Sequence, residues 1–327
     1  MIDINYHTKD LSKLSFLITG GAGFIGSNIV SYLIKHNAGR VVVLDNFSNG
    51  YIRNIEKFIG KPNFELIEGD ITDSDTCKKA MKGIDYVSHQ AALGSVPRSI
   101  ENPLATHQAN TTGFINILLA AKENNIKRVI FASSSSVYGD SQYSPKKEDV
   151  IGNQLSPYAV SKRAKELYAS VFALNYGLDV VGLRYFNVFG PNQSPNGPYA
   201  AVIPLFINAV MNNKSPYING DGEQCRDFTY VDNVVQANIK AFFSDKEVKG
   251  KIINIAFGKK NTINDLFSKI RAISNCTIEP IYREPRKGDV KNSLADITLA
   301  KELLGYEPSI SVDVGLKQTM DWFQINK

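Results

Sequence analysis

The chain has 327 residues, of which 43% are hydrophobic and 21% are charged, and its formal net charge is +5. This balance is typical of a globular protein and excludes a disordered or fibrous chain. The positive charge is spread along the chain without a basic run, so we expect no nucleic-acid partner.

The N-terminal segment, residues 1–13, is polar and has no apolar stretch followed by a small-residue cleavage site. The longest apolar runs, such as residues 41–44, have the length of strands, well below the roughly 18 residues of a membrane helix. Cysteines and histidines are scattered without metal-ligand spacing: Cys77, Cys225, Cys276, His7, His36, His89 and His107. We therefore expect a cytoplasmic protein with reduced thiols, no membrane segment and no metal.

Apolar runs alternate with amphipathic stretches through the first half of the chain. The pattern predicts strands at residues 16–18, 41–45, 64–67, 86–88, 128–132 and 180–183, and helices at about 25–34, 74–81, 103–124 and 158–175. Continuous apolar strands that alternate with helices are typical of a parallel sheet covered on both faces. We therefore predict an α/β fold built on a Rossmann-type doubly wound parallel sheet.

The regular pattern ends near residue 183, and prolines then crowd residues 191–204. This segment predicts a long loop, followed by helices at about 203–212 and 231–243, a strand at 252–255, and a C-terminal part of short elements. The length suits one large domain with a smaller companion. We expect domains at 1–183 and 184–327, the second a smaller α/β unit, and leave open whether segment 231–256 returns to the first.

A glycine-rich turn follows the first predicted strand. Gly20, Gly23 and Gly26 stand in the spacing Gly-x-x-Gly-x-x-Gly, directly after the apolar run and at the start of a helix. Glycine permits the tight turn and lets the backbone approach a pyrophosphate, whose charge the helix N-terminus then stabilises. This context predicts a dinucleotide site, to which Phe24 and Ile25 also contribute.

Acidic residues end the next two strands. Asp45 can accept hydrogen bonds from a ribose 2′-hydroxyl and repel a 2′-phosphate. No arginine follows until Arg53, so we predict NAD rather than NADP. Asp70 is expected to reach the adenine amino group, with a turn cap as the alternative. The neighbouring residues that complete the expected cofactor site are Asn46, Ile71 and Ala91.

Tyr158 and Lys162 form the sequence Tyr-Ala-Val-Ser-Lys at the start of a helix, where residues i and i+4 share a face. The positive charge of the lysine favours tyrosinate, a general base able to take a proton from a sugar hydroxyl as the cofactor oxidises the carbon. Four serines, residues 133–136, follow a predicted strand at the edge where such folds place their sites. We select Ser134 as the hydroxyl that contacts the reacting oxygen, with a polar turn as the alternative.

The motifs together resemble those of the extended short-chain dehydrogenases/reductases and, within that superfamily, the nucleotide-sugar 4-epimerases. The resemblance extends from Gly20 to about Tyr306. It is carried by residues 19–26, 89–92, 133–139, 158–162, 184–191, 220–228 and 286–289. The stretch 91–99, together with Gln193, is similar to the bacterial UDP-N-acetylglucosamine 4-epimerases.

The resemblance implies that Ser134, Tyr158 and Lys162 are catalytic, that Tyr158 and Lys162 also contact NAD, and that Asn110 lies near the active-site helices. The UDP-sugar site that it implies consists of Gly94, Ser95, Ser134, Ser135, Ser136, Asn187, Gln193, Ala201, Val202, Tyr217, Arg226, Arg286, Asp289 and Ser293.

Roles within that site follow the family's motifs. Asn187, Arg226 and Arg286 correspond to positions that bind the diphosphate, for which the planar guanidinium is suited, and surface salt bridges are the alternative for the arginines. Asp289 corresponds to a carboxylate near the uridine ribose. The positions that would hold the uracil ring are Ala201, Val202 and Tyr217.

The choice of reaction depends on the residues before Val-Tyr-Gly at 137–139. Related dehydratases carry Asp-Glu there, and related UDP-glucuronate decarboxylases carry a glutamate, whereas this chain has Ser135 and Ser136. The resemblance therefore implies C4 epimerisation through a 4-keto sugar with tightly bound NAD. Ser293 stands where epimerases restricted to non-acetylated sugars have a tyrosine, which favours a UDP-N-acetylhexosamine.

Other functions remain open at this level. The nearest alternative is a UDP-glucose or UDP-glucuronate 4-epimerase. An NAD-dependent nucleotide-sugar reductase and an NAD-binding sensor without chemistry belong to other classes. The resemblance further implies a homodimer formed through helices that include the one bearing Tyr158, and a role in surface polysaccharide assembly.

Overall fold

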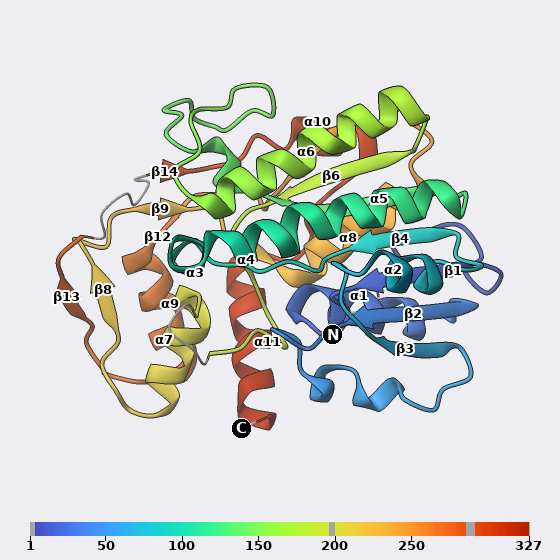
Figure 1. The fold of residues 1–327 in the computed structure, drawn as a ribbon. Helices are drawn as coiled ribbons and strands as arrows, with labels where there is room; N and C mark the ends of the chain where they lie inside the picture. Colours follow the sequence, from blue (N-terminus) through green and yellow to red (C-terminus); the bar gives the residue numbers. More distant parts are fainter. Residues whose placement is uncertain (1–3, 196–199, 286–291, 327) are drawn as a thin grey trace.

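A parallel sheet of seven strands lies at the centre of the computed structural model, which describes residues 4–195, 200–285 and 292–326 (Figure 1). The strand order is β11-β6-β5-β4-β1-β2-β3. The strands are β1 (Ser15–Thr19), β2 (Arg40–Asp45), β3 (Phe64–Glu68), β4 (Tyr86–His89), β5 (Arg128–Ser134), β6 (Val180–Tyr185) and β11 (Ile252–Ile255). Because β4 and β2 flank β1 on opposite sides, a crevice is expected at its carboxyl end. The predicted Rossmann-type fold is confirmed.

Helices cover both faces of this sheet (Figure 1). One face carries α2 (Ser74–Ala80), α4 (Pro103–His107), α5 (Gly113–Glu123) and α6 (Pro157–Tyr176), with the short α3 (Val96–Glu101) preceding α4. The other face carries α1 (Phe24–Lys35), α8 (Val231–Phe243) and α10 (Thr298–Leu304). Within the described ranges, no helix combines the length and the apolar composition that crossing a bilayer requires.

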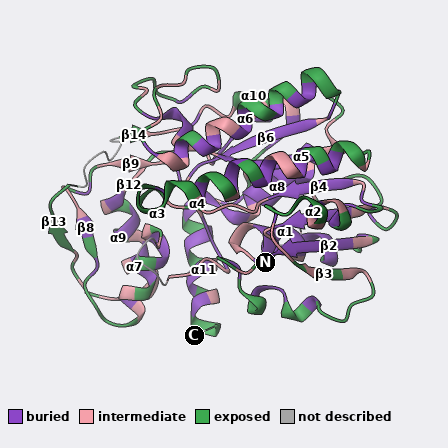
Figure 2. Ribbon diagram, in the orientation of Figure 1, coloured by how far each residue is buried: buried purple, intermediate pink, exposed green. Residues whose placement is uncertain are grey.

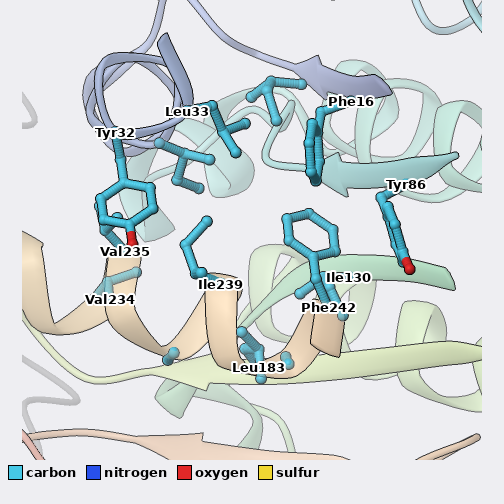
Figure 3. Close-up of a cluster of buried hydrophobic side chains, with 14 of the residues drawn as sticks. Phe16, Tyr32, Leu33, Tyr86, Ile130, Leu183, Val234, Val235, Ile239 and Phe242 are labelled. Atoms are coloured by element: carbon cyan, nitrogen blue, oxygen red, sulfur yellow. The ribbon is translucent and has the colours of Figure 1, made fainter. Parts of the chain in front are cut away.

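Successive residues of the central strands enter opposite cores. Phe16 belongs to the buried cluster under α1 and α8, whereas Leu17 belongs to the cluster under α2, α5 and α6. Figure 3 shows the first cluster, in which Phe16 and Tyr86 of the sheet lie beside Ile239 and Phe242 of α8. Burial on both faces accounts for the uninterrupted apolar runs of these strands.

A smaller lobe lies beside the carboxyl edge of the sheet (Figure 1). Its helices are α7 (Val202–Met211), α9 (Ile263–Ser274) and α11 (Val312–Ile325), whose apolar faces share a separate buried cluster. Its short strands are β7 (Val188–Phe189), β8 (Tyr217–Asn219), β9 (Cys225–Arg226), β10 (Thr229–Tyr230), β12 (Asn261–Thr262), β13 (Ile281–Arg283) and β14 (Asn292–Ser293). β8 pairs only with β13 in this part of the described structure.

Three features of the helices differ from the sequence prediction. The helix expected at 103–124 is divided by a π-helical turn at Gln108–Thr112. The short helix α3 was not predicted. The segment after residue 255, expected to hold only short elements, contains α9 and α11, of 12 and 14 residues. A capping box of Thr262 and Asp265 begins α9, a signal that the sequence already carried.

Candidate active site

A groove of about 500 Å³ opens at the carboxyl ends of the sheet strands. Loops that follow β1, β2, β3 and β4 line one part, and the ends of β5 and β6 with the start of α6 line the rest. The predicted residues that line it are Gly20, Gly23, Phe24, Ile25, Gly26, Asp45, Asn46, Asp70, Ile71, Ala91, Gly94, Ser134, Ser135, Tyr158, Lys162 and Asn187. One groove therefore unites the expected cofactor residues with the expected reactive group.

The glycine turn is closely packed against the loop after β4. Gly20 has a φ of +68°, and a Cβ there would lie 2.6 Å from the backbone nitrogen of Ala91. A Cβ on Gly26 would collide with the carbonyl oxygen of Gly20, so α1 can approach the turn only because residue 26 is glycine. The backbone N–H groups that begin α1 border the groove, an arrangement suited to a phosphate. The turn fits a dinucleotide pyrophosphate.

Asp45 is buried at the end of β2 and forms a hydrogen bond with the glycine turn. Its Oδ2 accepts a hydrogen bond from Ala22 N at 2.9 Å, and its Oδ1 accepts one from Phe47 N at 2.8 Å. Burial raises the pKa of this carboxyl. The amide of Asn46 donates to Oδ2 of Asp70 at 2.7 Å, so the loops after β2 and β3 form a continuous polar wall. These carboxylates can accept ribose and adenine donors.

The reactive group lies at the opposite end of the groove. Ser156 caps α6 by accepting from Ala159 N, which sets the start of the helix just before Tyr158. Lys162 Nζ lies 5.6 Å from the Tyr158 ring centre and donates to the carbonyl oxygen of Ala132 at 3.0 Å. Tyr158 is half-buried and Lys162 is buried. The lysine ammonium group is therefore held beside the phenol ring.

A buried ion pair between α6 and β6 contacts the end of β5. Glu166 of α6 binds the Arg184 guanidinium through both oxygens, at 2.8 and 2.9 Å, and accepts a hydrogen bond from Ser133 Oγ at 2.5 Å. Fully enclosed Arg–carboxylate pairs persist only when their hydrogen bonds are satisfied, as these are. The network holds Ser133, which immediately precedes Ser134 on β5. Sequence reasoning did not find it, because the partners are distant along the chain.

Asn110 connects the loop after β4 with the Tyr158 helix. Its Oδ1 accepts from Leu93 N at 2.7 Å, and its Nδ2 donates to Leu93 O at 3.1 Å and to Ser161 Oγ at 3.0 Å. Ser161 Oγ donates in turn to the carbonyl oxygen of Tyr158 at 2.8 Å. Asn110 lies within the π-helical turn and is fully buried. The sequence motif pointed to Asn110 without indicating these contacts.

A second cavity of about 360 Å³ lies in the smaller lobe. Val202 and Tyr217, two of the residues expected around a uracil ring, line it, whereas Ala201 does not. The Arg283 guanidinium lies 4.9 Å from the Tyr217 ring centre and donates to Asn219 Oδ1 at 2.7 Å. Apolar walls from α7 and a polar wall from β8 and β13 suit a flat, polar-edged ring.

Several predicted substrate residues line neither cavity: Ser95, Ser136, Gln193, Ala201, Arg226 and Ser293. Ser95 Oγ instead caps α3, and Gln193 donates to Val188 O at 3.1 Å. Arg226 and Ser293 lie opposite each other in the β9–β14 pair. Arg286 and Asp289 lie outside the described residues.

Metal-ligand clusters were not expected from the sequence. Among the described residues, no group of three or more His, Cys, Asp or Glu side chains is arranged to hold a metal ion.

Comparison with known proteins connects this geometry to a family. A model of the family described as "NAD dependent epimerase/dehydratase family" matches residues 16–256. The chain is 41% identical over 312 residues, 95% of its length and 98% of the relative's, to a putative UDP-glucose 4-epimerase of Methanocaldococcus jannaschii.

Two solved structures extend the comparison. A UDP-N-acetylglucosamine 4-epimerase of Methanobrevibacter ruminantium, in complex with UDP-N-acetylmuramic acid, has a TM-score of 0.91 and 44% identity, covering 96% of this chain and 99% of that one. A UDP-glucuronic acid 4-epimerase of Bacillus cereus, in complex with UDP-glucuronic acid and NAD, has a TM-score of 0.89 and 32% identity, covering 96% and 100%. These three proteins are all named as 4-epimerases and differ in the sugar.

Proposed function

We propose that this chain, which belongs to the NAD dependent epimerase/dehydratase family, interconverts UDP-N-acetylglucosamine and UDP-N-acetylgalactosamine. At the coarser level the chain is an NAD-dependent UDP-sugar 4-epimerase, an isomerase. The observation that carries the proposal is the single groove in which the glycine turn, Tyr158, Lys162 and Ser134 meet.

NAD is the cofactor, and the groove residues fit it. When bound, it supplies the oxidant and then the reductant for C4 of the sugar. The glycine turn and the first N–H groups of α1 would hold its pyrophosphate. Asp45, at the end of β2, would accept from the adenosine ribose, and Asp70 would accept from the adenine amino group.

The reactive side chains then have separate tasks. Tyr158, as tyrosinate, takes the proton of the 4-hydroxyl while that carbon is oxidised, and returns it after reduction on the other face. Lys162 stabilises the tyrosinate through its charge and is oriented by the Ala132 carbonyl oxygen. Ser134 hydrogen-bonds the reacting oxygen in both halves of the reaction. Inversion at C4 requires the 4-keto sugar to rotate within the site, so that its opposite face is reduced.

The second cavity supports the nucleotide part of the proposal. Ile281 N donates to Pro216 O at 2.9 Å and Gly220 N donates to Arg283 O at 2.8 Å, so these groups of the β8 segment point to β13. Backbone groups alternate sides along a strand, and those of Tyr217 therefore point to the opposite edge. Along that edge of β8, a backbone carbonyl oxygen could accept from the N3–H of uracil, and a backbone N–H could donate to its O4.

The N-acetyl preference rests on the small side chain of Ser293. Ser293 lies in β14 opposite Arg226, the residue expected to contact the diphosphate. A tyrosine at position 293 would place a larger side chain beside that contact. The similar enzyme of M. ruminantium is named for UDP-N-acetylglucosamine, which favours the same sugar here. UDP-glucose and UDP-glucuronate remain the second candidates, because other relatives carry those names.

The test is turnover by the purified protein with no NAD added. UDP-N-acetylglucosamine, UDP-glucose and UDP-glucuronate are supplied separately, and products are separated as UDP-sugars with mass balance. We expect the acetylated sugar to give the highest kcat/KM and no net NADH to accumulate. A higher kcat/KM for either other sugar would overturn the substrate assignment. Stoichiometric consumption of added NADH would indicate a reductase instead.

We also propose a homodimer formed through α5 and α6. Val160, Leu167, Val171 and Leu174 of α6 are exposed, Leu174 to 83%, although they are large and apolar. Exposed stretches of both helices appear in Figure 2. Contiguous apolar surface of this kind marks an interaction site. Light scattering should give a molar mass twice that of the chain. The Leu174→Glu variant should give a molar mass closer to that of the monomer.

The three cysteines are unpaired in the structure, with Cys77 buried. Reduced thiols are typical of the cytoplasm, where we propose that the enzyme supplies a UDP-sugar for surface polysaccharide.

A further inference from the structure

A hydrogen bond joins two loops that lie on opposite sides of the glycine turn. Nη1 of Arg98, on α3, donates to Oδ1 of Asn49, in the loop after β2, at 2.6 Å. α3 follows β4 in the sequence, and β4 and β2 flank β1 in the sheet. Strands in a sheet lie roughly 4.8 Å apart, so this link bridges two strand spacings across the carboxyl end of β1.

The Arg98 side of the link is anchored in the active site. The loop that leads to α3 is held at Leu93 by both polar atoms of the Asn110 amide. Ser95 then has a φ of +102°, unusual for a residue with a side chain, and its Oγ accepts from Arg98 N at 3.3 Å. The turn that presents Arg98 is therefore fixed by contacts at both of its ends.

The Asn49 side is anchored to the glycine turn itself. Tyr51 N donates to the carbonyl oxygen of Ala22 at 3.0 Å, and Ser48 N donates to Asn46 Oδ1 at 3.0 Å. Asn49 lines the groove and is exposed at its mouth. A solvent-exposed side-chain bond between two supported loops can open without disturbing the core beneath them.

We propose that Arg98 and Asn49 form a strap across the groove that keeps NAD bound between the oxidising and reducing halves of the reaction. Asn49 lines the groove beside the glycine turn, and Arg98 reaches it from α3 across the carboxyl end of β1, so the bond would restrict the exit of a pyrophosphate bound at that turn. If the cofactor dissociated after the oxidation step, the keto sugar could not be reduced again. Slow release of the cofactor therefore favours completion of the reaction. The inference rests on the NAD assignment and does not depend on which sugar is used.

The experiment measures NAD release without any sugar. Protein loaded with isotopically labelled NAD is diluted into excess unlabelled NAD, and the bound label is followed over time. We expect Arg98→Ala to release the label roughly tenfold faster, since a hydrogen bond to a charged group contributes on the order of one tenfold step or more. Asn49→Ala should act similarly, and the double variant should be no faster than the faster single variant.

Two further variants separate the strap from general effects. Arg98→Lys keeps a donor of similar reach and should restore part of the retention. Arg53→Ala removes a guanidinium that lies over Tyr51 in the neighbouring segment and should leave the release rate unchanged. Thermal unfolding of the NAD-free variants should match that of the parent protein.

Three results would overturn the strap. An Arg98→Ala release rate equal to that of the parent would show that the bond retains nothing. Additive effects of the two substitutions would show that each residue acts alone, for example by separate contacts with the cofactor. A parent protein that holds no NAD would overturn the cofactor assignment, and the strap with it.

Discussion

The side-chain amide of Asn110 forms hydrogen bonds with both the N–H and the C=O of Leu93. The same amide binds Ser161, whose hydroxyl reaches the carbonyl oxygen of Tyr158. One side chain thus sets the loop after β4 against the first turn of α6. It can do so because the π-helical turn at Gln108–Thr112 directs Asn110 into the buried interface.

We expect Asn110→Ala to lower kcat by tenfold or more, because Leu93 and Ser161 lose their partner and Tyr158 loses its support. The unsatisfied groups should also lower the free energy of unfolding by about 1–3 kcal/mol. Steady-state kinetics and urea unfolding measure the two effects. Asn124→Ala, which removes an amide contact to Ala120 O at the far end of α5, is the control. Equal effects of both substitutions would contradict a positioning role.

Tyr158→Phe should lower kcat by roughly 10²- to 10⁴-fold, the usual contribution of a general base. Ser134→Ala should lower it less, because a neutral hydrogen bond is lost while the base remains. NAD content after purification should be unchanged in both, which separates chemistry from cofactor loss. Unchanged turnover by Tyr158→Phe would contradict the proposed mechanism and favour a non-catalytic sensor.

Ser293→Tyr should reduce kcat/KM for UDP-N-acetylglucosamine more than for UDP-glucose. A change in pocket fit of about 1–3 kcal/mol corresponds to a roughly 5- to 150-fold shift in their ratio. Ser293→Ala, which leaves the volume small, is the control and should preserve the ratio. If the tyrosine variant still prefers the acetylated sugar by the parental factor, the size argument is wrong.

Lys165 is fully buried on α6, and its Nζ lies 4.8 Å from the Phe114 ring centre with no hydrogen-bond partner among the described residues. Burial, and secondly the charge of Lys162, hold the pKa of Lys165 well below its ordinary value. Between the lowered pKa of the folded state and the unfolded value of about 10.4, the unfolded chain therefore binds an extra proton, so stability rises with pH toward that value.

Lys165→Met removes this proton linkage and should raise the free energy of unfolding at pH 7. The gain should shrink as pH increases toward 10, because the unfolded lysine then also loses its proton. Urea unfolding at pH 7 and 9.5 measures the difference. Exposed Lys301, changed to Met, should give no such pH-dependent gain. A Lys165→Met gain that is equal at both pH values would contradict the lowered pKa of Lys165.

Asp227 is fully buried and accepts from the backbone N–H groups of Phe257, Gly258 and Ala295. Burial raises its pKa to about 7. Because its unfolded value is about 3.9, the folded state binds more protons between these values, and this residue lowers stability as pH rises from about 4 to 7. In urea unfolding, Asp227→Asn should reduce the decrease in the free energy of unfolding between pH 5 and 7.5. An equal decline in parent and variant would contradict the raised pKa.

The sequence by itself determined the parallel sheet and the cofactor type. Residues such as Phe16 and Leu17 are both apolar because each face of β1 is buried, and this produces a pattern that can be read from one strand alone. The glycine spacing after β1 and the carboxylate of Asp45 are likewise local signals, since one turn and one strand end carry the chemistry.

Only the tertiary structure decided how the site is supported. The contacts from Asn110 to Leu93 and from Glu166 to Arg184 join segments that are separate in the sequence, and no local periodicity encodes them. The same holds for the link between Arg98 and Asn49, which depends on the order of β4, β1 and β2 in the sheet. Hydrogen-bond partners are chosen by proximity after the chain has packed, so their identity emerges only in the folded molecule.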